Sequence, residues 1–369
     1  MTNVSPDPIF QMATGFWVSK TLMTAVELEV FTKLSGNKSV TFEQLQNDIL
    51  EMDKRPAEVF ATALISLGLI NVSGGEKKKN KESKGGEEER SEKTIIYSNS
   101  QLSEEFLDRN KPSYIGDFVV MMDKHLYNRW GKLPTSLKTN KPVEKTEGQI
   151  SGQDMYDQAK INQGIEQIQM FTRSMYGISV GPAMTLPKIF DFSDHRKMID
   201  IGGGSGIYSI QIVKTNPNMS ALILDLEPVC KVSDEYIRQF NLRGKIQTQV
   251  ADFLSTEDFP KGCDVALLSH IIHFQSEEKD KMLITKVYDC LPEDGNGVIL
   301  ISEWLLNDEK TGPVSSALMS LTMIIDQPEG RNYSFQEVSR MLTDVGFTNI
   351  EKRPLVGPAD LVIGYKNKK

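Results

Sequence analysis

The second half of the chain alternates short apolar runs with longer amphipathic stretches, which predicts strands followed by helices. We predict strands at Lys197–Ile201, Ala221–Asp225, Lys245–Val250, Asp264–Ser269, Gly297–Ser302, Thr348–Lys352 and Leu361–Tyr365. We predict helices at Tyr208–Thr215, Pro228–Phe240, Glu277–Cys290, Val314–Ile325 and Ser334–Val345. This alternation indicates an α/β fold with a parallel sheet and right-handed crossovers. Because ligands of such sheets bind beyond the carboxyl ends of the strands, we expect the functional residues there.

The N-terminal part of the chain has a different pattern. Apolar side chains recur at helical spacing in Arg55–Leu67, and Leu69–Val72 and Thr94–Ser98 then predict two strands of a hairpin. Upstream, Thr41–Leu45 has the composition of a short capped helix. A helix followed by a hairpin indicates a winged-helix module, which we place within residues 1–110.

A winged helix raises the question of DNA binding, and two observations disfavour it. The helix Arg55–Leu67 has one Arg at its start and no row of Arg, Asn or Gln that could read base edges. The whole chain has 42 Lys and Arg against 50 Asp and Glu, a net charge of −8, which does not suit a phosphate-binding surface. We therefore expect no nucleic-acid partner, and we expect this helix in the core or in a subunit interface.

Two further segments complete the predicted organisation. Residues 74–93, GGEKKKNKESKGGEEERSEK, have no apolar side chain, so we expect a mobile, charged insertion in a solvated loop. A role in regulation or partner binding is the alternative. Residues 111–185 have helical patterns with many Met and aromatic side chains, which predicts a connecting region that packs its helices or lines an apolar pocket. The α/β domain then covers residues 186–369.

Several features of the sequence indicate the cellular compartment in which the protein works. The chain has no apolar run of about 18 residues, so we expect no membrane span. Its N-terminus lacks the basic and apolar regions of a secretory signal. Cys230, Cys263 and Cys290 form no CxxC pair, which excludes a disulfide scaffold and a cysteine-rich zinc site. We therefore expect a cytoplasmic protein.

A glycine-rich loop follows the first predicted strand, in the sequence Asp-Ile-Gly-Gly-Gly-Ser-Gly from Asp200 to Gly206. Glycines let the chain turn tightly and let a ligand approach the backbone. Asp225 ends the next strand, 23 residues after Gly202, where a carboxylate reaches ribose hydroxyls. A nicotinamide site needs a glycine where this chain has Ile207, so a ligand with a ribose and an amino-acid tail fits better.

The third strand is followed by Asp252 and Phe253, an acid and an aromatic ring that can hold the amino group and the ring of adenine. Together with Leu268–His273, Gly312-Pro313 and Asp344–Phe347, these motifs make the chain resemble S-adenosylmethionine-dependent small-molecule O-methyltransferases of the caffeate and hydroxyindole type and their microbial relatives. The resemblance covers nearly the whole chain.

The resemblance implies a fold, an assembly and a set of cofactor residues. It implies an N-terminal winged-helix dimerisation domain, a Rossmann-like methyltransferase domain with a seven-stranded, mostly parallel sheet, and a homodimer. It implies S-adenosylmethionine as the methyl donor and S-adenosylhomocysteine as the product. The loop residues would hold the methionyl part, the second-strand acid the ribose and the Asp-Phe pair the adenine. The implied cofactor residues are Asp200, Gly202, Gly204, Gly206, Asp225, Leu226, Asp252 and Phe253.

The resemblance also implies a catalytic base. Of the four histidines, His273 occupies the position of the family's base at the end of the fourth strand, where it would deprotonate the acceptor. We expect His270 to be a packing or supporting residue. A metal site at His270 and His273 is a third interpretation, but the sequence shows no obvious third ligand, so we expect no metal.

This chain departs from the family at two places near the base. Phe274 and Gln275 replace an Asp-Trp pair, and Asn332 stands where the family has a Glu that steadies the His. Glu303, after the fifth strand, is a second candidate partner, so we expect Glu303 or Asn332 to orient His273. Asn332 could accept a hydrogen bond but would not stabilise an imidazolium as a charge would.

We therefore predict an O-methyltransferase that acts on a hydroxyl of a small aromatic or polyketide-like molecule. The alternatives are a member of the same family that methylates carbon, or one that decarboxylates or hydroxylates without methyl transfer. A winged-helix regulator that senses a ligand through its α/β domain is a more distant alternative.

Overall fold

The structure is a computed structural model that describes residues 4–36, 38–75, 94–144, 152–161 and 163–368. The chain divides into two compact units, residues 1–123 and 124–369. The limit between these units lies after residue 123, and helix α10 (Ile165–Ile189) runs across the boundary predicted after residue 185; the predicted division into three parts stays a prediction. Among the described residues, no helix combines the length and the apolar character that a membrane crossing requires.

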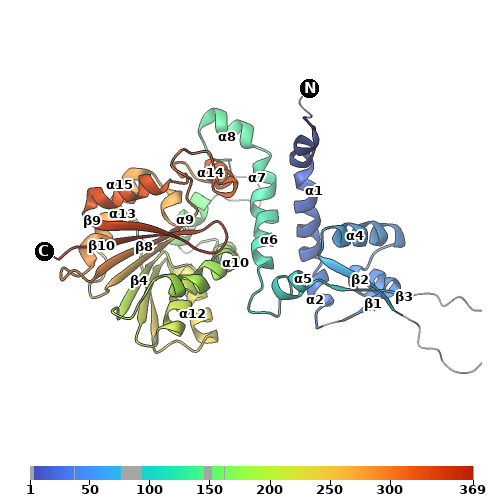
Figure 1. The fold of residues 1–369 in the computed structure, drawn as a ribbon, viewed down its shortest axis with the longest axis horizontal. Coiled ribbons are helices and arrows are strands. Elements are labelled where there is room, and N and C mark those ends of the chain that lie inside the picture. Colours follow the sequence, from blue (N-terminus) through green and yellow to red (C-terminus); the bar gives the residue numbers. More distant parts are fainter. Residues whose placement is uncertain (1–3, 37, 76–93, 145–151, 162, 369) are drawn as a thin grey trace, which may run out of the picture. The chain divides into compact units, whose positions relative to one another are not determined.

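The first unit is a set of helices with a small antiparallel sheet of strand order β1-β3-β2 (Figure 1). Its strands are β1 (Val40–Thr41), β2 (Ile70–Gly75) and β3 (Thr94–Asn99). Its helices are α1 (Asp7–Glu27), α2 (Val30–Lys33), α3 (Phe42–Gln44), η1 (Leu45–Leu50), α4 (Lys54–Ser66), α5 (Gln101–Phe106) and α6 (Gly116–Met121), and η2 (Met122–Tyr127) crosses the limit between the units.

Local sequence explains this winged-helix arrangement. Thr41 and Gln44 form the reciprocal hydrogen bonds of a capping box, which starts the short helix α3. After α4, Gly68 adopts a φ of 68°, a left-handed conformation that lets the helix end and the chain enter β2. The helix and hairpin predicted from the sequence are confirmed. Residues 76–93, most of the predicted charged insertion, lie outside the described residues.

The second unit contains a seven-stranded sheet of order β6-β5-β4-β7-β8-β10-β9. Strand β10 is antiparallel to both neighbours and the remaining pairs are parallel, as expected for a mostly parallel sheet. The strands are β4 (Lys197–Ile201), β5 (Ser220–Asp225), β6 (Ile246–Val250), β7 (Val265–Ser269), β8 (Gly297–Glu303), β9 (Phe347–Pro354) and β10 (Asp360–Lys366). The helices are α7 (Asn128–Trp130), α8 (Leu133–Thr139), α9 (Gly152–Lys160), α10, α11 (Ile207–Thr215), α12 (Glu227–Gln239), η3 (Ile272–Phe274), α13 (Glu277–Cys290), α14 (Val314–Asp326) and α15 (Phe335–Val345).

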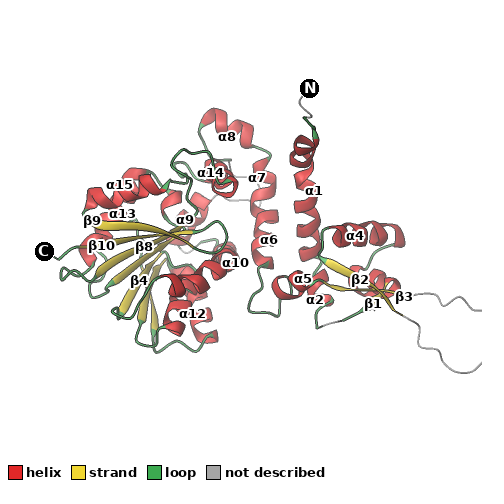
Figure 2. Ribbon diagram, in the orientation of Figure 1, coloured by secondary structure: helices red, strands yellow, loops and turns green. Residues whose placement is uncertain are grey.

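Helices cover both faces of this sheet, and the two cores alternate along each strand (Figure 2). Met198 of β4 faces the core formed with α10, α11 and α12, whereas its neighbour Ile199 faces the core formed with α13 and α15. Both side chains are fully buried, and each contributes about 1.5–3 kcal/mol by leaving water. Burial on both faces explains why the strands read as continuous apolar runs.

The parallel register brings the functional segments to one edge of the sheet. Ile201 pairs with Leu224, so the glycine loop after β4 starts opposite Asp225. Ser269 pairs with Ser302, so the chain after β7 starts opposite Glu303. The carboxyl ends of four neighbouring strands therefore place these segments together.

Candidate active site

The glycine loop leaves exposed backbone at this edge of the sheet. Gly202, Gly204 and Gly206 all have positive φ values, of 65°, 58° and 74°, before α11 begins at Ile207. A Cβ at Gly202 would lie 2.4 Å from Cδ1 of Ile271, whereas a Cβ at Gly204 would meet nothing within 4 Å. The first glycine is therefore required by packing, and Gly204 presents its backbone to open space where a ligand can approach.

Asp225 lies directly across from this loop. Its carboxylate accepts the backbone N–H of Gly204 at 2.9 Å and that of Leu226 at 2.8 Å. Burial raises the pKa of Asp225 to about 6, although these two hydrogen bonds favour the ionised form and so act to lower that pKa. Each oxygen has capacity for a further hydrogen bond, so the pair can accept the two hydroxyls of a ribose. Leu226 contributes a backbone donor, and its side chain is buried.

Asp200 lies beneath the loop. Its side chain is 1% exposed, Oδ2 accepts the hydroxyl of Ser209 on α11 at 2.7 Å, and Oδ1 has no partner in the described part of the chain. Burial, with a contribution from the charge of Asp225, raises the pKa of Asp200 to about 7. This position supports the loop from below, and the expected contact with the amino-acid part of a donor stays a prediction.

Two side chains of α9 meet the Asp-Phe pair after β6. The Tyr156 hydroxyl donates to Asp252 Oδ1, and Lys160 Nζ lies 2.9 Å from Asp252 Oδ2. The Tyr156 ring lies 6.4 Å from the ring of Phe253. Burial alone would raise the pKa of Asp252, but the hydrogen bonds of Tyr156 and Lys160 outweigh it and lower that pKa. We expected the aromatic side chains of residues 111–185, which include Tyr156, to pack helices or to line a pocket, and Lys160 was missed, although their spacing of four puts both on one face of a helix.

His273 and Glu303 form the central pair of the site. His273 stands in the short helix η3, directly after β7, and Glu303 ends the neighbouring strand β8. His273 Nδ1 lies 2.7 Å from Glu303 Oε2, and both side chains are at most 3% exposed. Burial would raise the pKa of Glu303, but the charge and hydrogen bond of His273 outweigh it and lower that pKa. An ionised carboxylate only accepts, so Nδ1 donates and Nε2 keeps a free lone pair.

Asn332 does not contact the imidazole. Its side-chain nitrogen donates to the carbonyl of Trp304 at 2.7 Å, and its oxygen accepts the hydroxyl of Ser320 at 3.1 Å. Both ends of the amide are therefore occupied, one by the backbone of Trp304 after β8 and the other by Ser320 of α14. The structure places Glu303, and not Asn332, at hydrogen-bond distance from His273, because β8 runs beside β7, whereas the amide of Asn332 is bonded to Trp304 and Ser320.

His270 lies beside this pair. Its φ of 55° is unusual for a residue other than glycine, and its Nδ1 lies 3.9 Å from Glu303 Oε2. Burial lowers the pKa of His270 to about 4, so the ring is neutral at neutral pH. The expectation that the two histidines lack a third potential ligand is wrong. Glu303 supplies it, and one ligand atom from each of the three residues lies within 4.8 Å of the others.

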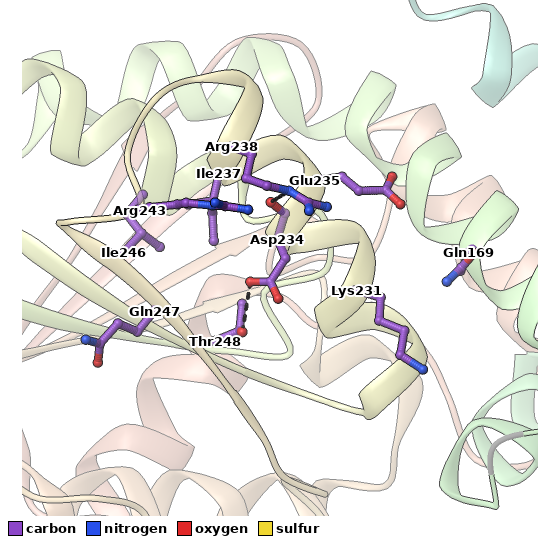
Figure 3. A pocket seen from close by; sticks show the side chains of 10 residues that line it. All are labelled: Gln169, Lys231, Asp234, Glu235, Ile237, Arg238, Arg243, Ile246, Gln247 and Thr248. Atoms are coloured by element: carbon purple, nitrogen blue, oxygen red, sulfur yellow. Dashed lines mark hydrogen bonds between the residues drawn. The ribbon is translucent and has the colours of Figure 1, made fainter.

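A separate hollow of about 780 Å³ lies at the β6 edge of the sheet (Figure 3). It is lined by Gln169, Lys231, Asp234, Glu235, Ile237, Arg238, Arg243, Ile246, Gln247 and Thr248. Its side chains are of mixed charge, and Asp234 already accepts the hydroxyl of Thr248 at 3.0 Å. None of the site residues predicted from the sequence lines this hollow.

Comparisons with known proteins show the family of this chain. Residues 138–348 match the O-methyltransferase domain, and residues 10–109 match the O-methyltransferase dimerisation domain. The 3-hydroxy-5-methyl-1-naphthoate 3-O-methyltransferase of Streptomyces sahachiroi is 29% identical over 363 residues, 98% of this chain and 95% of that protein. The acetylserotonin O-methyltransferase of Gallus gallus is 28% identical over 369 residues, 98% and 97% of the two chains.

Solved structures with a similar fold align over the whole length of this chain. Human N-acetylserotonin methyltransferase in complex with SAM aligns over 100% of both chains with a TM-score of 0.81 and 21% identity. The chain therefore belongs to the O-methyltransferase family. It is an S-adenosylmethionine-dependent methyltransferase with the family's dimerisation domain at its N-terminal end.

The residues of this chain fit that cofactor. The backbone at Gly204 leaves open space, which fits a ligand with an amino-acid tail, and the buried carboxylate of Asp225 has the acceptor oxygens that suit a ribose. Asp252 and Phe253 present an acceptor oxygen and a ring for adenine. The cluster of acids also suits a ligand that carries positive charge.

Proposed function

We propose that this enzyme transfers a methyl group to a hydroxyl of a small aromatic or polyketide-like molecule, with His273 as the general base. The observation that carries the proposal is the 2.7 Å contact between His273 Nδ1 and the buried carboxylate of Glu303. This contact fixes the tautomer in which Nε2 is free to accept a proton, at the strand end next to the donor loop.

Different residues hold the methyl donor and deprotonate the acceptor. S-adenosylmethionine, when bound, supplies an electrophilic methyl group. Asp225 and the loop glycines hold the donor in place, which supplies the proximity that an in-line displacement needs. His273 accepts the proton of the acceptor hydroxyl at Nε2, which makes the oxygen nucleophilic. Glu303 stabilises the resulting imidazolium through Nδ1–H, because opposite charges attract strongly in a buried site.

The acceptor class rests on the relatives. The two relatives described above are named for hydroxynaphthoate and acetylserotonin, both of which present an aromatic hydroxyl. In this chain, Phe171 of α10 and the methionines of α14 lie on elements of the second unit that pack near η3 and α9. Aromatic and Met side chains suit flat, irregular ligands.

We also propose that the enzyme works as a cytoplasmic homodimer. Helix α1 exposes a row of large apolar side chains, and Trp17 alone is 62% exposed. The row consists of Ile9, Phe10, Met12, Phe16, Trp17 and Val18. Its position inside the segment that matches the dimerisation domain supports burial of this row against a second copy. Sedimentation of wild-type protein and Trp17→Glu tests this: a monomer in both would refute the dimer.

Product analysis tests the reaction. Purified protein is incubated with S-adenosylmethionine that carries a trideuterated methyl group and with a panel of hydroxynaphthoates, hydroxyindoles and phenolic polyketides. We expect one labelled methyl on an aromatic oxygen, located by mass spectrometry and NMR. A label on carbon would establish the C-methyltransferase alternative. A product that lost CO2 or gained oxygen without label would establish the non-methylating alternative.

A further inference from the structure

Three potential metal ligands meet at the ends of β7 and β8. Glu303 Oε2 lies 2.7 Å from Nδ1 of His273 and 3.9 Å from Nδ1 of His270. The two imidazole rings have centroids 5.8 Å apart and are inclined by 71°, so their edges converge on the carboxylate instead of stacking. The sequence places both histidines three residues apart, and the strand pairing adds the carboxylate from a distant part of the chain.

The cluster contains buried polar atoms that have no hydrogen-bond partner among the described residues. Glu303 is 2% exposed, and its Oε1 has no hydrogen-bond partner in the described part of the chain. His270 Nε2 is also buried without a partner among those residues. Among the described residues, Glu303 pairs only with the two histidines, and no Lys or Arg of that part of the chain pairs with it. A buried carboxylate without a permanent cation favours the arrival of one.

The spacing suits a divalent transition metal ion. With metal–ligand bonds of about 2.0–2.2 Å, tetrahedral ligand atoms lie about 3.4 Å apart. The observed separations, from 2.7 Å to at most 4.8 Å, bracket that value, so small side-chain rotations suffice. Two imidazoles and one carboxylate are typical of zinc and of cobalt or nickel, and they leave a fourth position open.

We propose that His270, His273 and Glu303 bind a zinc-type divalent cation, and that this ion switches the enzyme off. The ion takes the place of the proton between His273 Nδ1 and Glu303. The displaced proton moves from Nδ1 to Nε2, so the ring stays a neutral imidazole that binds the metal through Nδ1. Nε2 then no longer accepts the proton of an acceptor. The inhibitory part of this proposal rests on the proposed role of His273 as base, whereas the binding part does not.

Binding is measured with Co²⁺ alone, because four-coordinate Co²⁺ absorbs visible light and Zn²⁺ does not. The full-length protein is titrated with Co²⁺, and Zn²⁺ is then added to displace it. We expect one Co²⁺ per chain and at least about tenfold weaker binding in His270→Gln. The matched control is His195→Gln, a buried histidine whose Nδ1 lies 4.0 Å from Asp264 and which joins no group of three potential metal ligands among the described residues. That variant should bind Co²⁺ as the wild type does.

Three outcomes separate the two parts of the proposal. Absence of Co²⁺ uptake, or equal uptake by wild type and His270→Gln, overturns the metal site. If His270→Gln does not fold by circular dichroism, His273→Gln takes its place in the same titration with the same expected loss. Methyl transfer by the wild type should stop with Zn²⁺ and recover with a chelator, and the remaining activity of His270→Gln should be insensitive to Zn²⁺. Binding of Zn²⁺ without inhibition would keep the site and overturn the role of His273 as base.

Discussion

Replacing Glu303 by Gln removes the charge beside His273 and keeps the size and a hydrogen-bond acceptor. The contact of 2.7 Å between Nδ1 and Oε2 places the centres of the two charged groups about 4 Å apart in the imidazolium state. At an effective dielectric constant of about 20, this separation corresponds to about 4 kcal/mol of attraction. At about 1.36 kcal/mol per tenfold in rate, full loss would slow the transfer about 1000-fold. The amide retains part of the interaction, so we expect a loss between about 100-fold and 1000-fold.

The assay is single-turnover methyl transfer with saturating donor and acceptor, which isolates the chemical step. The affinity for S-adenosylhomocysteine, measured by calorimetry, should stay within about threefold of wild type, because Glu303 lies outside the donor residues. The comparison variant is Asn332→Ala, which removes contacts to Trp304 and Ser320 and leaves the imidazole pair intact. A rate loss below about fivefold in Glu303→Gln, or a larger loss in Asn332→Ala, would refute this reasoning.

Three further predictions concern the donor site. Burial raises the pKa of Asp225 to about 6. The affinity for S-adenosylhomocysteine should therefore fall about tenfold between pH 7 and pH 5, as the carboxyl is protonated. Calorimetry on Asp225→Asn should show no such pH dependence. Burial raises the pKa of Asp200 from 3.8 to about 7, so its ionised form destabilises the fold as pH rises through this range. Asp200→Asn should therefore raise the free energy of unfolding by up to about 4 kcal/mol at pH 8 and change it little at pH 4, as urea unfolding would show. Gly204→Ala should lower the free energy of unfolding by only about 1–2 kcal/mol, because of its positive φ, yet it should lose donor binding. Gly202→Ala should be less stable still, because its Cβ meets Ile271. Equal stability of the two variants would contradict this difference in packing.

Signals along the chain were enough to predict that the glycine loop and Asp225 lie together. The glycine loop and Asp225 each follow a buried strand, and strand order then brings them together without any knowledge of side-chain packing. His273 could be placed for the same reason, because it directly follows β7. The mostly parallel sheet was predictable because apolar runs and helical periods alternate along the chain, and both faces of the sheet are buried.

Contacts between distant segments could not be predicted in this way. The choice between Glu303 and Asn332 depends on which side chain the fold brings within hydrogen-bond distance of His273, and no spacing along the chain reports this. Lys160 of α9 reaches Asp252 across 92 positions of sequence, and it carries no motif that marks it. Glu303 as a third ligand beside His270 became visible only when the register of β7 and β8 was known.

The most direct test of the account compares His273→Gln with the wild type in single-turnover methyl transfer, with S-adenosylhomocysteine binding measured on the same samples. We predict that donor binding is retained and that the transfer rate falls by at least about 100-fold, because the Gln amide cannot act as a general base. A variant that binds the donor and transfers the methyl group at the wild-type rate would contradict His273 as the base.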